Sequence, residues 1–218
     1  MSKLITKKEF IPLAILLAAI IVGVLVYPSL PAKVPSHWNI NGEIDGYIGK
    51  TFAVCFFPGL ILAIYLLMTF APLINPLRKN IEKSAKAYFY LKLLLVSFFS
   101  ALYMYTIIAA FAGGENFLID LLIIPTFGLL IIGMGFLMPH FKKNYFIGIR
   151  TLWTLGSEEV WDKTHQRAKK FYIIGGLCIV FGGLLHIPFW FVFSVMMVFL
   201  LWPVVDSYIL FKKLGKGR

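Results

Sequence analysis

The side chains best suited to molecular recognition lie in one polar stretch between two apolar runs, residues 139–170. Arg150 carries a planar guanidinium with five donors, which can hold a carboxylate or a phosphate in a fork. The tryptophans of this stretch could anchor a partner, because indole rings dominate many protein interfaces. The alternative is an interfacial arginine and aromatic belt without a recognition role. The candidate functional residues here are Gly148, Arg150, Thr151, Trp153, Thr154, Trp161 and His165.

A second group of polar and aromatic residues lies between residues 28 and 51. Prolines at 28, 31 and 35 favour an extended chain, and Asn41-Gly42 favours a two-residue hairpin turn. In the predicted register Trp38 faces Asp45, so His37 and Asp45 project from opposite faces, and we expect no metal site. Asp45 is instead expected to satisfy backbone donors, with His37 solvated. The candidate residues of this loop are His37, Trp38, Asn39, Gly42 and Asp45.

Ionisable residues inside apolar runs are costly and often functional. Lys92 and Asp206 are expected at similar depth in their runs, so an ion pair between them, or snorkelling of each to the surface, is predicted. Asp120 and Glu115 lie near the end of a run, where solvation is expected.

The motifs of common enzyme classes are absent from the sequence. It contains no HExxH zinc motif, no GxSxG nucleophile motif and no glycine-lysine phosphate loop. We therefore expect no catalytic residues, no metal and no cofactor.

The elements that must position these residues are membrane-spanning helices. Hydrophobic residues make up 60% of the 218 residues and charged residues 14%, against typical values of about 45–50% and 25%. Such a composition excludes a soluble enzyme or a nucleic-acid-binding domain. Runs of about 20 apolar residues can cross a bilayer. Six runs predict an all-α polytopic fold of three helical hairpins: 11–27, 52–74, 88–112, 117–138, 171–185 and 189–211.

The orientation follows from the lysines and arginines of the connecting segments. With the N-terminus inside, eighteen lie in inner segments and two, Lys33 and Lys50, in outer loops. The sequence therefore predicts that both termini are cytoplasmic in the plasma membrane and that the loop at 28–51 is extracellular. We expect a two-span module at 1–75 and a four-span module at 76–218, with its cytoplasmic loop at 139–170.

The cytoplasmic loop has its own helical signal. Ser157 can cap a helix whose first turn holds Glu158 and Glu159. We expect a short interfacial helix that runs into the fifth span, preceded by a segment at 146–151 that folds back against the bundle. Gly148 would permit close backbone packing there. Paired glycines at 175–176 and 182–183 form a stripe suited to helix packing.

Two stretches resemble a known family of bacterial membrane proteins. Residues 144–155, then Glu159-Val160-Trp161, His165 and Arg167, resemble the signature of the SdpI family. The loop with His37-Trp38-Asn39, Gly42 and Asp45 resembles an N-terminal module often fused to it. The resemblance implies immunity to a secreted peptide toxin outside the cell. It also implies signalling by holding a transcriptional regulator at the membrane, without direct binding of nucleic acid.

Two other function classes are alternatives to immunity. A small transporter or exporter of a peptide or lipid-like substrate would need a polar stripe through the bundle. An intramembrane enzyme would need convergent polar groups, which the sequence does not show.

Overall fold

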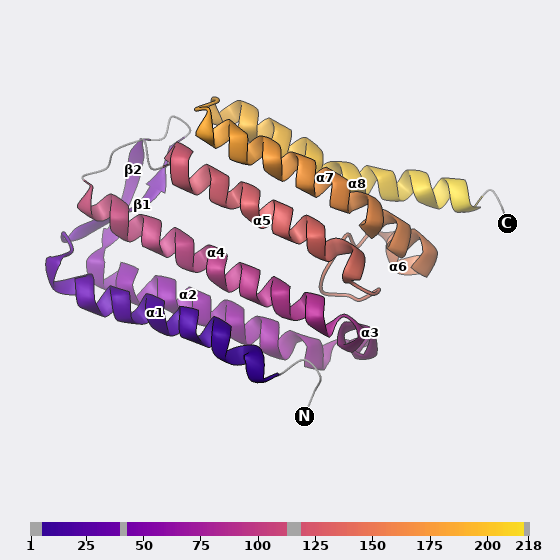
Figure 1. Ribbon diagram of the computed structural model, residues 1–218, viewed down its shortest axis with the longest axis horizontal. Coiled ribbons are helices and arrows are strands. Elements are labelled where there is room, and N and C mark those ends of the chain that lie inside the picture. The colour runs from indigo at the N-terminus through magenta and orange to yellow at the C-terminus, as the bar shows by residue number, and fades with distance from the viewer. Residues whose placement is uncertain (1–5, 40–42, 113–118, 216–218) are drawn as a thin grey trace.

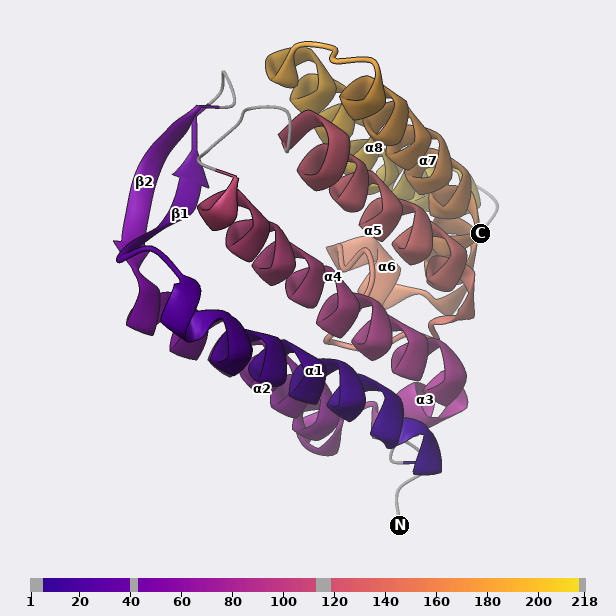
Figure 2. The same cartoon turned by 60° about the vertical axis from the view of Figure 1, so that its left-hand side comes forward.

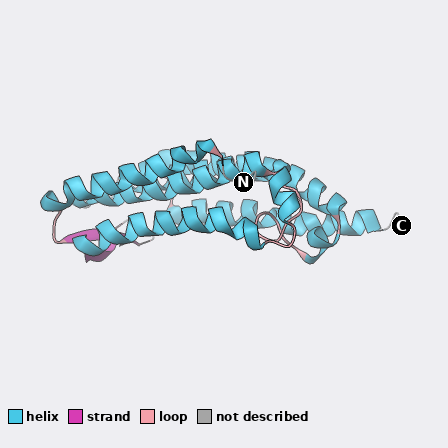
Figure 3. Ribbon diagram, turned by 90° about the horizontal axis from the view of Figure 1, so that it is seen from below, coloured by secondary structure: helices cyan, strands magenta, loops and turns pink. Residues whose placement is uncertain are grey.

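The computed structural model describes residues 6–39, 43–112 and 119–215. Long helices lie alongside one another, with a small hairpin at one end of the bundle and both chain ends at the other (Figure 1). Seen from below, the helices form layers, and the strands are confined to one end (Figure 3). The helices are α1 Phe10–Val26, α2 Lys50–Phe70, α3 Arg78–Lys83, α4 Ala85–Phe111, α5 Ile124–Leu137, α6 Leu152–Gly156, α7 Glu158–Leu184 and α8 Phe189–Gly215.

The predicted hairpin is present as two antiparallel strands, β1 Lys33–Trp38 and β2 Ile44–Gly49. The proposed turn at Asn41-Gly42 lies outside the described residues. The predicted register is wrong by one residue along most of the hairpin, where Val34 pairs with Ile48 and Trp38 with Ile44. His37 alone pairs as that register has it, with Gly46, because the pairing is irregular on both sides of His37. An irregularity of this kind adds an unpaired residue, which a strict alternation rule cannot anticipate.

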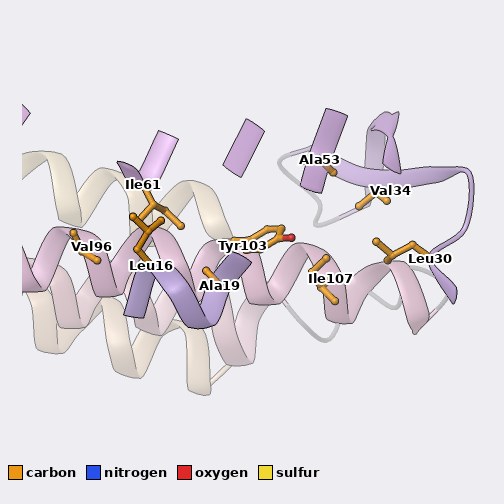
Figure 4. Close-up of a cluster of buried hydrophobic side chains, with 9 residues drawn as sticks. All are labelled: Leu16, Ala19, Leu30, Val34, Ala53, Ile61, Val96, Tyr103 and Ile107. Atoms are coloured by element: carbon orange, nitrogen blue, oxygen red, sulfur yellow. The ribbon is translucent and has the colours of Figure 1, made fainter. Parts of the chain in front are cut away.

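The first group of helices, α1, α2 and α4, encloses an apolar core (Figure 4). Tyr103 of α4 is fully buried, and its ring stacks on Phe57 of α2 with centroids 5.5 Å apart. The hairpin joins this core through Val34, which is also fully buried. The strand pair is therefore packed onto the helices. The buried residues of this core are Leu16, Ala19, Leu30, Val34, Ala53, Ile61, Val96, Tyr103 and Ile107.

The second group consists of α5, α7 and α8, which lie side by side (Figure 2). Gly128 of α5 meets Gly176 of α7 so closely that a Cβ on Gly128 would lie 2.6 Å from the Gly176 carbonyl oxygen. On the other side of α7, Gly175 faces the Phe199 ring of α8. The predicted packing role of the α7 glycines is thus confirmed.

Five helical segments of the described chain are long and apolar enough to cross a membrane: 7–29, 50–74, 85–111, 121–140 and 189–214. The predicted fifth span, 171–185, is the second half of α7, whose first half is charged. The predicted helix that runs into this span is present as the first half of α7, which continues without a break for 27 residues. Its predicted start is confirmed, since the Ser157 side chain accepts a hydrogen bond from the Val160 amide.

Candidate functional site

The loop after α5 is organised by Asn144, which is almost completely buried. Its Oδ1 accepts hydrogen bonds from the amides of Phe146 and Ile147, each at 2.8 Å. Its Nδ2 donates to the carbonyl oxygens of Lys142 and Ile147 at 2.9 and 3.1 Å. One side chain therefore fixes the turn that leads into residues 146–151.

The same loop is attached to the start of the α3–α4 region. Asn80 Nδ2 donates to the Lys143 carbonyl oxygen at 2.9 Å, and the Lys142 amide donates to Ser84 Oγ at 2.9 Å. Ile147 packs against the apolar residues around Ile81 and Tyr88. The expectation that this segment folds back against the bundle is confirmed.

Gly148 lies at the closest approach between the loop and α7. Its φ of +114° is rarely adopted by residues with a side chain. A Cβ at this position would collide with His165 Nε2 and lie 3.0 Å from the Trp161 ring. The predicted role of Gly148 in close packing is confirmed, and its contacts are His165 and Trp161, two of the three aromatic residues of the candidate set.

Trp161 and His165 form a buried stack beneath the loop. Their ring centroids are 4.1 Å apart, and both side chains are at most 1% exposed. Trp161 Nε1 donates to the Phe141 carbonyl oxygen at 2.7 Å. Trp161 is thus a core residue, and its predicted use as a surface anchor is wrong because the indole is enclosed by its own loop.

His165 uses both ring nitrogens inside the protein. Nε2 accepts a hydrogen bond from the Ile149 amide at 3.1 Å, so Nδ1 carries the proton and donates to the Trp161 carbonyl oxygen at 2.8 Å. Burial lowers the pKa of His165 to about 4. The imidazole is therefore neutral near pH 7, with no lone pair free to bind a ligand or to accept a proton.

The two threonines of the candidate set form the first turn of α6. The Thr151 hydroxyl accepts from the Thr154 amide and the Thr154 hydroxyl accepts from the Thr151 amide, which is a reciprocal cap. Thr154 is fully buried and its hydroxyl also donates to the Ile149 carbonyl oxygen at 2.8 Å. These hydroxyls fix the loop and are not directed toward Arg150.

Trp153 connects α6 to α8. Its Nε1 donates to Ser207 Oγ at 2.5 Å, and its ring lies against Tyr208 and Phe211 with centroids 5.1 and 6.4 Å away. The second proposed tryptophan anchor is therefore also occupied by contacts within the chain.

Arg150 is the exposed member of the candidate set. Its guanidinium donates from Nη1 to the Tyr145 carbonyl oxygen, which leaves other donors of the fork for a ligand. Tyr145 and Leu152, two large side chains of the same segment, are 48% and 86% exposed. The arrangement thus presents a cation and apolar groups on a rigid loop.

Comparisons with known proteins show what this loop is similar to. Residues 140–207 match the sequence model of the SdpI/YfhL protein family. This segment of the chain is therefore similar to the SdpI/YfhL family. Residues 14–62 match a domain of unknown function, DUF1648. The chain is similar to the immunity protein SdpI of Bacillus subtilis (strain 168), with 27% identity over 216 residues that cover 97% of this chain and 100% of the relative. No solved structure gives a significant match.

The SdpI/YfhL match and the apolar helices establish a multi-pass membrane protein. All seven candidate residues of the loop lie in the matched segment. Six of the seven hold the loop, α6, α7 and α8 together. Arg150 is the seventh, and it is the exposed residue of the set. The family signature in this chain is therefore mainly a packing motif around one presented cation.

The hairpin residues lie in the DUF1648 segment, at the opposite end of the bundle. His37 Nδ1 lies 2.5 Å from Asp45 Oδ1, so the expectation that these side chains point to opposite faces is wrong. The register shift at His37 brings them together, and Gly46 leaves room for the His37 side chain. Asn39 bonds Glu43, with Nδ2 at 2.8 Å from the carboxylate.

The remaining candidate residues of the hairpin are Trp38 and Gly42. Trp38 packs toward the core of the second helix group, near Ile124. Gly42 lies outside the described residues.

The predicted ion pair between Lys92 and Asp206 is not formed. Lys92 lies 2.9 Å from Glu9, and Asp206 lies 2.9 Å from Arg167. The position of a residue along its helix does not show which helices are neighbours. In the fold, α4 packs on α1 and α2, whereas α8 packs on α7.

The partner of Lys92 was missed by sequence reasoning. Lys92 Nζ contacts both oxygens of Glu9 at 2.9 and 3.0 Å and donates to Thr69 Oγ1 at 3.1 Å. The sequence contains one indication of this partner, because Glu9 is a single acidic residue directly before the first apolar run. Glu9, Thr69 and Lys92 lie in neither matched segment, so this network connects α1, α2 and α4 outside the family motifs.

Proposed function

We propose that the protein is a non-catalytic membrane immunity protein that protects its cell from a secreted peptide toxin. The observation that carries this proposal is the likeness to the immunity protein SdpI along nearly the whole of both chains. The loop chemistry agrees with it. His165 is neutral with both nitrogens occupied, and the threonine hydroxyls are engaged in capping.

The proposed orientation has six crossings with both termini in the cytoplasm. The charge difference of eighteen basic residues against two supports it. So does the arrangement in Figure 1, where the hairpin is at the end opposite to the two termini. In this orientation the apolar half of α7 makes the fifth of the six crossings, and α8 makes the last.

The hairpin is the proposed contact for the peptide. In this orientation its polar pairs, His37 with Asp45 and Asn39 with Glu43, face the outside. Tyr47 on the second strand is 55% exposed and supplies an aromatic contact. In this proposal the module at 1–75 binds the toxin and the module at 76–218 responds to the binding.

Arg150 is the proposed contact for a cytoplasmic regulator. Its free guanidinium donors suit a carboxylate on an acidic partner, and exposed Leu152 beside it in sequence adds apolar area. The loop is held by buried hydrogen bonds on both sides, so little ordering is required on binding.

A protection assay tests this function. The chain is expressed in a bacterial strain that is sensitive to the sporulation-delaying peptide toxin, and survival is measured over a range of toxin concentrations. We expect the lethal concentration to rise relative to cells carrying an empty vector. Equal killing of the two strains, with the protein present in the membrane, would reject immunity to this toxin.

A further inference from the structure

A groove runs between α4 and α5, where the two helix groups meet. It has a volume of about 350 Å³ and is lined by Tyr90, Leu93, Leu94, Ser97, Gly133 and Leu137. On the α5 side Gly133 packs directly against α4, because a Cβ there would lie 2.8 Å from Leu94 Cδ2. Tyr90 in the lining is exposed, and Leu93 and Ser97 are partly exposed. Both helices are among those long enough to cross a membrane, so in a bilayer this exposed lining would face lipid.

The charges at one end of the groove are basic. Lys86 is exposed and lies one helical turn before Tyr90, on the same face of α4. Exposed His140 follows Leu137 by three residues at the end of α5. Neither Ala85–Phe111 nor Ile124–Leu137 contains an acidic residue. Helical side chains point toward the helix N-terminus, which directs Lys86 out of the apolar region toward lipid headgroups.

We propose that this groove binds one anionic phospholipid, with an acyl chain between α4 and α5 and its phosphate at Lys86. Tyr90, which is 42% exposed, stands at the boundary that aromatic rings prefer in membranes. A peptide helix fits less well. With a diameter of about 10–12 Å and a pitch of about 5.4 Å it needs about 420–610 Å³ for each turn, so the groove would hold less than one turn.

The test measures lipid binding by the full-length protein in detergent, using native mass spectrometry. Dioleoylphosphatidylglycerol is compared with dioleoylphosphatidylcholine, which has the same chains and no net charge. We expect tighter binding of the anionic lipid. Lys86→Ala should weaken it about fivefold, the effect of one lysine at an anionic surface. Lys213→Ala, which removes an exposed lysine of α8, is the matched control and should leave it unchanged.

The acyl chain is tested separately. Ser97→Phe should fill the groove and weaken binding more than tenfold, because each excluded methylene costs about fourfold in affinity. Ser97→Ala should bind like the parent. Glycerol 3-phosphate, which lacks acyl chains, should not compete. Equal binding of the two lipids, equal effects of Lys86→Ala and Lys213→Ala, or full competition by glycerol 3-phosphate would each overturn the proposal. Because Lys86 is on the surface, its variant decides the matter even if Ser97→Phe fails to fold.

Discussion

Gly148 and His165 depend on one another at the scale of single residues. A side chain at residue 148 would have to adopt a φ of +114° and displace the buried imidazole. Gly148→Ala should therefore lower the free energy of unfolding by about 3 kcal/mol, from backbone strain and overpacking together. Gly156→Ala is the matched control, since no atom lies within 4 Å of its Cβ position. Thermal unfolding in detergent measures both, and equal stabilities would contradict this packing.

The neutral state of His165 predicts a dependence of stability on pH. The pKa of His165 is about 4 in the folded protein and about 6.5 in the unfolded chain. The unfolded state therefore binds more protons between these values, so stability is full above pH 6.5 and falls as the pH drops toward 4. The loss between pH 7 and pH 4.5 should be about 2 to 3 kcal/mol.

His165→Asn isolates this contribution, because asparagine does not titrate. The unfolding free energy of the variant should fall less between about pH 7 and pH 4.5 than that of the parent, because the loss due to His165 is absent. The carboxylates contribute the same pH dependence in both proteins. Parallel profiles for the parent and the variant would show that folding does not lower the pKa of His165.

At the scale of elements, the buried charge pair joins α4 to the start of α1. The side chain of Lys92 is 1% exposed and that of Glu9 is 9% exposed, so loss of one partner leaves an unpaired buried charge. Lys92→Met should destabilise the protein by about 3 kcal/mol, and adding Glu9→Gln should restore part of that loss.

A second mutant cycle is the control for this pair. Lys92→Met combined with Asp206→Asn should be additive, because Asp206 contacts Arg167. A coupling energy between Lys92 and Asp206, with none between Lys92 and Glu9, would contradict the observed pairing of the helices.

The differences between expectation and structure at this scale have one cause. Hydrophobic runs located the helices, and Ser157 located the start of α7, because these signals are local. The partners of Lys92 and the irregularity at His37 depend on how helices and strands face one another, which spacing along the chain does not encode. The buried position of Trp161 was missed because its enclosing loop is held by Asn80 and Ser84, far away in the sequence.

At the scale of the whole molecule, the proposed orientation predicts which surfaces meet each side of the membrane. In a variant with Cys55 and Cys178 replaced by alanine, a cysteine at Tyr47 should react with an impermeant thiol reagent in intact cells. A cysteine at Gly156 should react only after the membrane is permeabilised. The reverse pattern would invert the topology and move the hairpin to the cytoplasm.

The wider organisation could be predicted in part. A membrane protein with apolar helices and a strand hairpin followed from composition and turn residues, and the matches to SdpI/YfhL and DUF1648 agree with the quoted signatures. The role of each signature residue could not be predicted, because arginine, tryptophan and histidine serve equally well in a core or on a surface. Only the burial of His165 and Trp161 and the exposure of Arg150 separate these roles.

The most direct measurement is the survival of toxin-treated cells that carry Arg150 variants. We expect Arg150→Ala to abolish protection and Arg150→Lys to reduce it, because lysine keeps the charge and loses the fork. Gly156→Ala should protect like the parent, and all variants should reach the membrane in equal amounts. Full protection by Arg150→Ala at equal membrane levels would contradict the claim that the protein acts through the cation presented on this loop.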